Sequence, residues 1–220
     1  GTAGAVHGLN VEYFPFDRNE MNIDIDKAKE KIEKNKKSYL AAIKAYNVCR
    51  PDLIEKLDTM GLFTDPASTM LSLHNAFPGG LVDHLLLVTQ YSLKLNDLLP
   101  EEIRATKESV VRVSLLHSIG KVGLYTPCKS DWHIKNQGKM YEFNEELTSM
   151  TIGERSIYYM ITNNNGDMLT DIEFQAIMNY DKPSSDKMSE WHTNTLGEIL
   201  KMAIKLAIIE EKKKQKENGK

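Results

Sequence analysis

Cysteine is scarce in this chain of 220 residues. The two cysteines, Cys49 and Cys128, lie far apart and in no metal-ligand spacing. Disulfide frameworks and zinc ribbons need more cysteines at closer spacing, so neither class of protein is supported. Two isolated thiols favour the reduced state and therefore a cytoplasmic location.

Long apolar runs are also missing. No stretch approaches the ~20 apolar residues that are needed to span a bilayer. The small residues at positions 1–5 are not followed by the charged and apolar segments of a signal peptide. We therefore expect no membrane association and no export signal.

Neither sign of charge dominates the chain. It has 28 Lys and Arg residues against 31 Asp and Glu residues, which gives a formal net charge of -3. Capture of nucleic acid by the whole surface is therefore not favoured, although a local basic pocket would still be compatible with this balance. The length and the 41% of hydrophobic residues fit one globular domain with a helical extension.

The spacing of apolar residues predicts an all-α protein. Helices are expected at about 24–46, 51–61, 80–98, 101–118, 153–161, 170–178 and 194–210. Pro51 suits the first turn of the second helix, and Thr170 with Glu173 predicts a capping box. The expected organisation is an N-terminal arm and helical extension over 1–65, a domain over 66–210 and a disordered Lys-rich tail over 211–220.

A long stretch over 119–150 lacks the helical period. Within it, residues 132–135 and 139–143 flank the turn-forming sequence Asn136-Gln137-Gly138. This pattern predicts a small β-hairpin inserted in a long loop. Loops of this length inside a compact domain are usually functional.

Two histidines lie in recognisable surroundings. His84 closes the sequence FPGGLVDH, and His117 lies in LLHSIGK, which ends at Lys121. Together these motifs resemble the HD-domain superfamily of metal-dependent phosphohydrolases over about residues 70 to 210. The resemblance implies an HD-like helical bundle. It also implies a metal site built from one histidine, a consecutive His-Asp pair and an Asp on a late helix.

The chain departs from that pattern at two ligands. Ser118 stands where the family has the paired aspartate, and Ile204 stands at the position expected for the late aspartate. His84 and His117 keep the imidazole positions and are the candidate metal ligands and weak catalytic candidates, with packed core histidines as the structural alternative. Two imidazoles alone hold a divalent ion weakly. We therefore expect no tightly bound metal, with a Mn, Mg, Fe, Ni or Co ion as the alternative. Other acids could replace the missing ligands from another direction: Asp83, Asp131, Asp167, Asp171 and Asp181.

Cationic and aromatic residues surround the second motif. Such side chains neutralise phosphate and stack on bases, which predicts a pocket for a nucleotide or another phosphorylated small molecule. Aromatic pairs that only stabilise the hairpin are the structural alternative. The candidate ligand-binding residues are Lys121, Tyr125, Trp132, Lys135, Lys139, Tyr141, Arg155 and His74.

Three functions are compatible with these features. The favoured hypothesis is an HD-like protein with an impaired metal site that sequesters or senses a nucleotide. The alternatives are an active phosphohydrolase or nuclease that uses replacement ligands, and a non-catalytic scaffold that forms homo-oligomers. Nucleic acid is an alternative partner that is not favoured.

Overall fold

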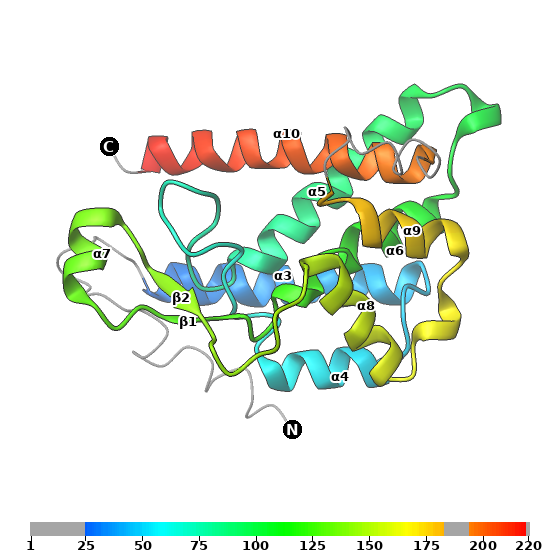
Figure 1. Cartoon of the computed structure of the whole chain (residues 1–220). Coiled ribbons are helices and arrows are strands. Elements are labelled where there is room, and N and C mark those ends of the chain that lie inside the picture. Colours follow the sequence, from blue (N-terminus) through cyan, green and yellow to red (C-terminus); the bar gives the residue numbers. More distant parts are fainter. Residues whose placement is uncertain (1–24, 183–193, 219–220) are drawn as a thin grey trace.

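The computed structural model describes residues 25–182 and 194–218 (Figure 1). Residues 1–24 of the predicted N-terminal arm lie outside the described residues, as do residues 183–193 and 219–220. The division into an arm, a domain and a tail stays a prediction.

The described chain is helical apart from one small hairpin, which confirms the predicted all-α class with a hairpin insertion (Figure 1). Its α-helices are α3 (Ile25–Ala45), α4 (Pro51–Met60), α5 (Gly80–Leu98), α6 (Lys107–Leu116), α7 (Asp131–Gln137), α8 (Ile152–Thr162), α9 (Asp171–Asn179) and α10 (Thr195–Asn218). Short 3-10 helices are η2 (Glu101–Ile103), η3 (Ile119–Lys121) and η4 (Gly166–Met168). No described helix is both long enough and apolar enough to cross a membrane.

Several helix ends follow directly from local sequence. Pro51 occupies the first turn of α4, and Gly61 ends that helix at a φ of 112°, a left-handed conformation that favours glycine. The predicted capping box at the start of α9 is confirmed, because the Thr170 side chain accepts from the Glu173 N–H and Glu173 bonds back to the Thr170 N–H. Thr151 and Glu154 form the same box at the start of α8.

The predicted strand over 132–135 is wrong, because these residues belong to α7. The Ser130 side chain accepts from the His133 N–H and starts this helix, and Gly138 ends it at a φ of 63°. The hairpin instead pairs β1 (Tyr125–Pro127) with β2 (Tyr141–Phe143) in antiparallel register, with α7 as its connection. We call residues 125–143 the α7 lobe.

Two other helix boundaries differ from the prediction. The helix expected over 101–118 begins only at Lys107, where the Thr106 side chain accepts from the Ser109 N–H. Helix α10 does not end near residue 210 but continues to Asn218, through the residues predicted to be disordered. Its last turns therefore form part of the folded molecule.

Helix α5 lies at the centre of the packing. It contacts α10, α6 and α3, and its buried side chains include Leu81, Leu85 and Val88 (Figure 1). A second, smaller core lies under the α7 lobe and contains Ala76, Cys128, Ile134, Met140 and Tyr141. The loop between α4 and α5 joins the two cores, and this junction positions the histidines described next.

Candidate metal centre

His84 lies in the first turns of α5, and a neighbouring loop lies tightly against this end of the helix. A Cβ atom on Gly80 would lie 2.3 Å from the Asn75 carbonyl oxygen, so only glycine permits the contact. The Asn75 side chain in turn donates to the Gly80 carbonyl at 3.0 Å. The Gly79-Gly80 pair of the motif therefore brings residue 75, and with it His74, against the start of α5.

The loop that carries His74 is held by hydrogen bonds on both sides. Ser68 Oγ donates to the His74 carbonyl oxygen at 2.5 Å, and the Ala67 N–H donates to the Asn75 carbonyl oxygen at 3.0 Å. The rings of His74 and His84 consequently lie 4.6 Å apart between centroids. His74 was predicted as a ligand-binding residue and not as a metal ligand.

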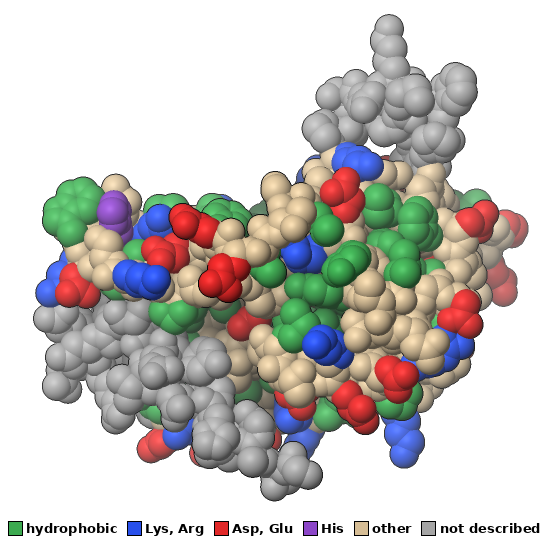
Figure 2. Space-filling model, turned by 60° about the horizontal axis from the view of Figure 1, so that its bottom comes forward, with side chains coloured by type: hydrophobic (Ala, Val, Ile, Leu, Met, Phe, Trp, Pro, Cys, Tyr) green, Lys and Arg blue, Asp and Glu red, His purple; other side chains and the backbone are tan. Residues whose placement is uncertain are grey.

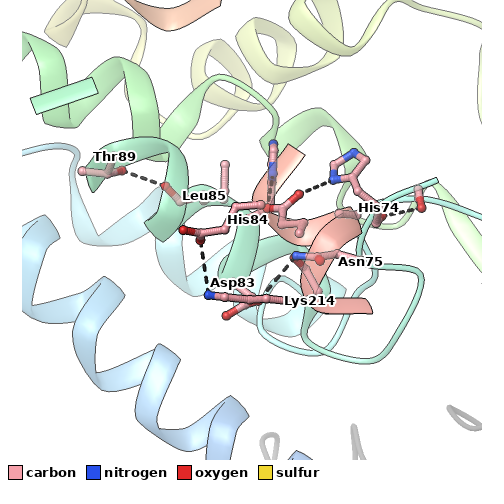
Figure 3. Close-up of polar contacts among 12 residues, drawn as sticks. His74, Asn75, Asp83, His84, Leu85, Thr89 and Lys214 are labelled. Carbon is pink, nitrogen blue, oxygen red and sulfur yellow. Dashed lines mark hydrogen bonds and ion pairs between the residues drawn. The ribbon is translucent and has the colours of Figure 1, made fainter. Parts of the chain in front are cut away.

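A carboxylate from the far end of the chain joins these two imidazoles (Figure 3). Glu211 Oε1 lies 2.7 Å from His84 Nδ1, and Glu211 Oε2 lies 2.8 Å from His74 Nδ1. All three side chains are buried. Among the described residues, His74, His84 and Glu211 are the one group of histidine, cysteine or acidic side chains that could hold a metal ion.

Burial and hydrogen bonding shift the pKa values of Glu211 and His84 in this group. Burial alone would raise the pKa of Glu211, but hydrogen bonds from His74 and His84 outweigh it and lower this pKa to about 2. Burial lowers the pKa of His84 to about 4, against the opposing effect of Glu211. At neutral pH the site therefore offers an ionised carboxylate and a neutral imidazole, the forms that bind metals.

His117 lies beside this group and not within it. Its ring centroid is 6.1 Å from that of His84, and its Nδ1 is 2.8 Å from the Ser114 carbonyl oxygen. Burial, reinforced by His84, lowers the pKa of His117 to about 3, so its imidazole is neutral. The adjacent Ser118 Oγ is buried without a hydrogen-bond partner among the described residues.

The acid on the last helix is not at the position of Ile204, where the HD-domain resemblance placed it. Ile204 packs against the hydrophobic core, and the carboxylate that reaches the histidines lies seven residues later on the same helix. Glu211 continues the buried face of α10 formed by Leu200, Ala203 and Ala207. The sequence signal for Glu211 is its position on the apolar face of the last helix. It was not used, because residues 211–220 were predicted to be a disordered tail.

The replacement acids considered from sequence do not join the group. Asp83 faces α3, where Lys31 Nζ lies 3.4 Å away and Asn35 donates to it at 3.1 Å. Asp167 forms an ion pair with Arg50. Asp131 and Asp171 begin α7 and α9, and Asp181 is exposed after α9.

Lys121, another predicted ligand-binding residue, lies close to the group and interacts with it electrostatically. Its Nζ donates to the Ala67 carbonyl oxygen at 2.7 Å, on the chain segment that leads to His74. Burial lowers the pKa of Lys121 to about 8, while Glu211 acts in the opposite direction. The positive charge of Lys121 also contributes to the low pKa values of His84 and His117.

The other predicted ligand-binding residues occupy three separate surroundings. Tyr141 is buried in the small core and Tyr125 packs against it. Trp132 and Lys135 are exposed on α7, and Lys139 follows that helix. Arg155 is buried on α8, where it donates to the Thr148 carbonyl oxygen. A single pocket containing all of them stays a prediction.

Comparisons with known proteins give partial similarities. The chain is 26% identical over 93 residues to the dihydroneopterin 2',3'-cyclic phosphate phosphodiesterase of Methanocaldococcus jannaschii, which covers 41% of this chain and 36% of that enzyme. It is 58% identical over 38 residues to the serine hydroxymethyltransferase of Nitrosopumilus maritimus, which covers 17% of this chain and 9% of that enzyme. The serine hydroxymethyltransferase of Korarchaeum cryptofilum is also 58% identical, over 36 residues and 8% of its length.

No family model matches the chain, and no solved structure matches it. The chain spans 9% or less of the serine hydroxymethyltransferases and 36% of the phosphodiesterase. The longest of these similarities is therefore to a phosphodiesterase, and it concerns less than half of this chain.

Proposed function

We propose that this protein is a metal-dependent phosphodiesterase whose site is built from His74, His84 and Glu211. The observation that carries the proposal is the Glu211 carboxylate, 2.7 Å and 2.8 Å from the Nδ1 atoms of the two histidines. It supplies the acidic ligand that Ser118 and Ile204 do not. The HD-domain resemblance and the 26% identity to a phosphodiesterase support the same class of reaction.

The donor set fits a borderline transition metal. Two imidazoles and one carboxylate bind Zn, Mn, Fe, Co or Ni ions and leave coordination positions for water and substrate, whereas Mg prefers oxygen ligands. A bound ion of this kind would polarise a phosphoryl oxygen and lower the pKa of a water molecule. Glu211 would also orient both imidazoles through their Nδ1 atoms.

The reaction proposed is hydrolysis of a phosphodiester. A water oxygen forms a bond to phosphorus, one ester P–O bond breaks, and the departing oxygen leaves as an alcohol after gaining a proton. Lys121 would neutralise a phosphoryl oxygen in this reaction, because its Nζ donates to the Ala67 carbonyl oxygen on the segment that leads to His74. Cyclic 2',3'-phosphates are the first substrates to test, because the Methanocaldococcus relative is a 2',3'-cyclic phosphate phosphodiesterase.

The test combines metal content with turnover. The chelator-stripped protein is reloaded with Zn, Mn, Co, Ni, Fe or Mg, the bound metal is measured by elemental analysis, and hydrolysis of 2',3'-cyclic nucleotides and bis(p-nitrophenyl) phosphate is followed. Glu211→Gln should lower metal affinity and turnover by at least about 100-fold, since it removes the carboxylate ligand of the site. Glu210→Gln is the matched control, because Glu210 points to Tyr91 and Lys214 instead.

Nucleotide binding without hydrolysis is the second candidate function. The burial of His84 and Glu211, whose contact satisfies the carboxylate without an ion, favours a site that holds no metal, as this candidate requires. Calorimetry with the same nucleotides separates the two candidates. Nucleotide binding without metal uptake or turnover would replace the phosphodiesterase proposal, and a protein with neither metal nor turnover would refute it.

A further inference from the structure

The α7 lobe carries an exposed tryptophan that has no role in the candidate metal centre. Trp132 is 60% exposed, although its neighbours Ile134 and Tyr141 are buried in the small core. The ring of His133 packs edge-on against it at 5.3 Å between centroids. A large aromatic face that is held in position and open to solvent suits stacking with a planar ligand.

Lysines lie around this tryptophan on the lobe. Lys129 and Lys135 are exposed, and Lys139 is half-buried at the end of the α7 turn. Figure 2 shows the lobe projecting from the body of the molecule, with Lys or Arg side chains interspersed with Asp or Glu side chains on the visible face. Acidic residues of the lobe are fewer, namely Asp131 and Glu142.

The end of α10 adds a second group of lysines next to the lobe. Gln215 Nε2 donates to the Leu71 carbonyl oxygen at 2.6 Å, and the Leu71 N–H donates to the Gly138 carbonyl oxygen at 2.9 Å. One loop segment therefore separates α10 from the lobe (Figure 1). The exposed lysines of this helix end are Lys212, Lys213, Lys214 and Lys216.

The two segments carry more lysines than acidic residues, although the whole chain does not. Residues 128–143 and 212–218 contain seven lysines and three acidic residues, whereas the whole chain has a net charge of -3. These lysines therefore lie on the two segments that adjoin the loop that carries His74. Lysines beside an exposed aromatic ring are the features with which proteins bind single-stranded nucleic acid.

We propose that the α7 lobe and the end of α10 together bind a single-stranded nucleic acid. One base stacks on Trp132, and the phosphates on either side of it lie against the lysines of the two edges. This binding site is separate from the proposed hydrolysis and needs no metal. A strand held there would pass over the loop of His74, so that a polynucleotide would be the substrate class if both proposals hold.

The experiment measures fluorescence anisotropy of labelled single-stranded RNA and DNA 12-mers, without added metal, over a range of salt concentrations. Binding should weaken as salt increases, because phosphate contacts release counterions. Trp132→Ala should weaken it about 10-fold, the size of one lost base stack. Trp132→Phe should restore most of the affinity, since the aromatic face is kept.

Two charge-reversal variants separate a local site from general electrostatics. Lys129→Glu with Lys135→Glu should weaken binding strongly, whereas Lys34→Glu with Lys37→Glu, the same charge change on exposed positions of α3, should not. Equal losses in the two variants would overturn the proposal. It would also be overturned by equal competition from polyglutamate, or by no binding at about 100 µM protein, the weak limit of non-specific binding.

The outcome is independent of the phosphodiesterase proposal. Glu211→Gln should retain binding of the 12-mers, and Trp132→Ala should retain metal uptake and hydrolysis of bis(p-nitrophenyl) phosphate. Circular dichroism checks the fold of every variant. Each proposal can then fail without affecting the other.

Discussion

At the scale of single residues, the proposed function depends on Glu211. Without it, the two buried histidines would share no negative charge, and a divalent ion would be held by neutral donors alone. With it, the described residues contain two imidazoles and one carboxylate whose ligand atoms lie within 4.8 Å of one another. A single side chain therefore changes the expectation from two imidazoles alone to a group of three possible metal ligands.

Asp65 gives a prediction about pH and stability. It is buried, and although the Gly123 N–H donates to it at 2.8 Å, burial raises its pKa from 3.8 to about 7. The folded state therefore retains a proton that the unfolded state loses between these values, so the contribution of Asp65 to stability falls as pH rises from about 4 to about 7.

Asp65→Asn should consequently stabilise the protein at pH 8 and have little effect near pH 4. The full shift corresponds to at most about 4 kcal/mol, and about 1–3 kcal/mol is expected because the new amide needs its own partner. Urea unfolding at both pH values measures the difference. Asp97→Asn, at an exposed position, should show no such pH dependence, and a variant less stable than the parent at pH 8 would contradict the prediction.

At the scale of elements, the start of α5 and the loop before it form one unit. The contact of Gly80 with the Asn75 carbonyl allows His74 to approach His84, and the Ser68 and Ala67 hydrogen bonds hold the loop in this position. The loop, α5 and α10 each contribute one side chain to the candidate metal centre. A change in their packing should therefore alter metal affinity.

Gly80→Ala tests this dependence. The added Cβ would lie 2.3 Å from the Asn75 carbonyl oxygen, so the loop must move, with an expected loss of about 1–3 kcal/mol of stability and weaker zinc binding. Gly197→Ala in α10 is the matched control, because its Cβ meets its nearest atom at 3.4 Å and alanine favours helix. Urea unfolding and zinc titration of both variants measure the effects, and unchanged zinc affinity in Gly80→Ala would be inconsistent with this role.

At the scale of the whole molecule, metal binding should stabilise the fold. The three ligands come from residues 74, 84 and 211, so an ion that binds them joins segments far apart in the chain. At 100 times the dissociation constant, the gain is about 2.7 kcal/mol, or roughly 5–10 °C in Tm for a chain of this size. Thermal unfolding with Zn or Mn should show this increase, Mg should show less, and Glu211→Gln should show none.

The sequence by itself determined the helical class and most helix positions, because apolar spacing, Pro51 and the Thr170–Glu173 box act locally. Two motifs also pointed to His84 and Lys121 as site residues, and their roles stay predictions. The start of α6 and the structure of residues 132–135 were predicted wrongly, since competing local signals at Thr106, Ser130 and Gly138 were not weighed.

Only the tertiary structure decided the composition of the site. The spacing of apolar residues indicates which face of a helix is buried. The partner of a buried acid depends instead on how elements distant in sequence pack together. Glu211 lies 127 residues from His84 and 137 from His74, and their contact exists because α10 continues past residue 210 and crosses α5 beside the loop. The exposure of Trp132 was decided in the same way, because the small core accommodates Ile134 and Tyr141 and leaves the indole outside.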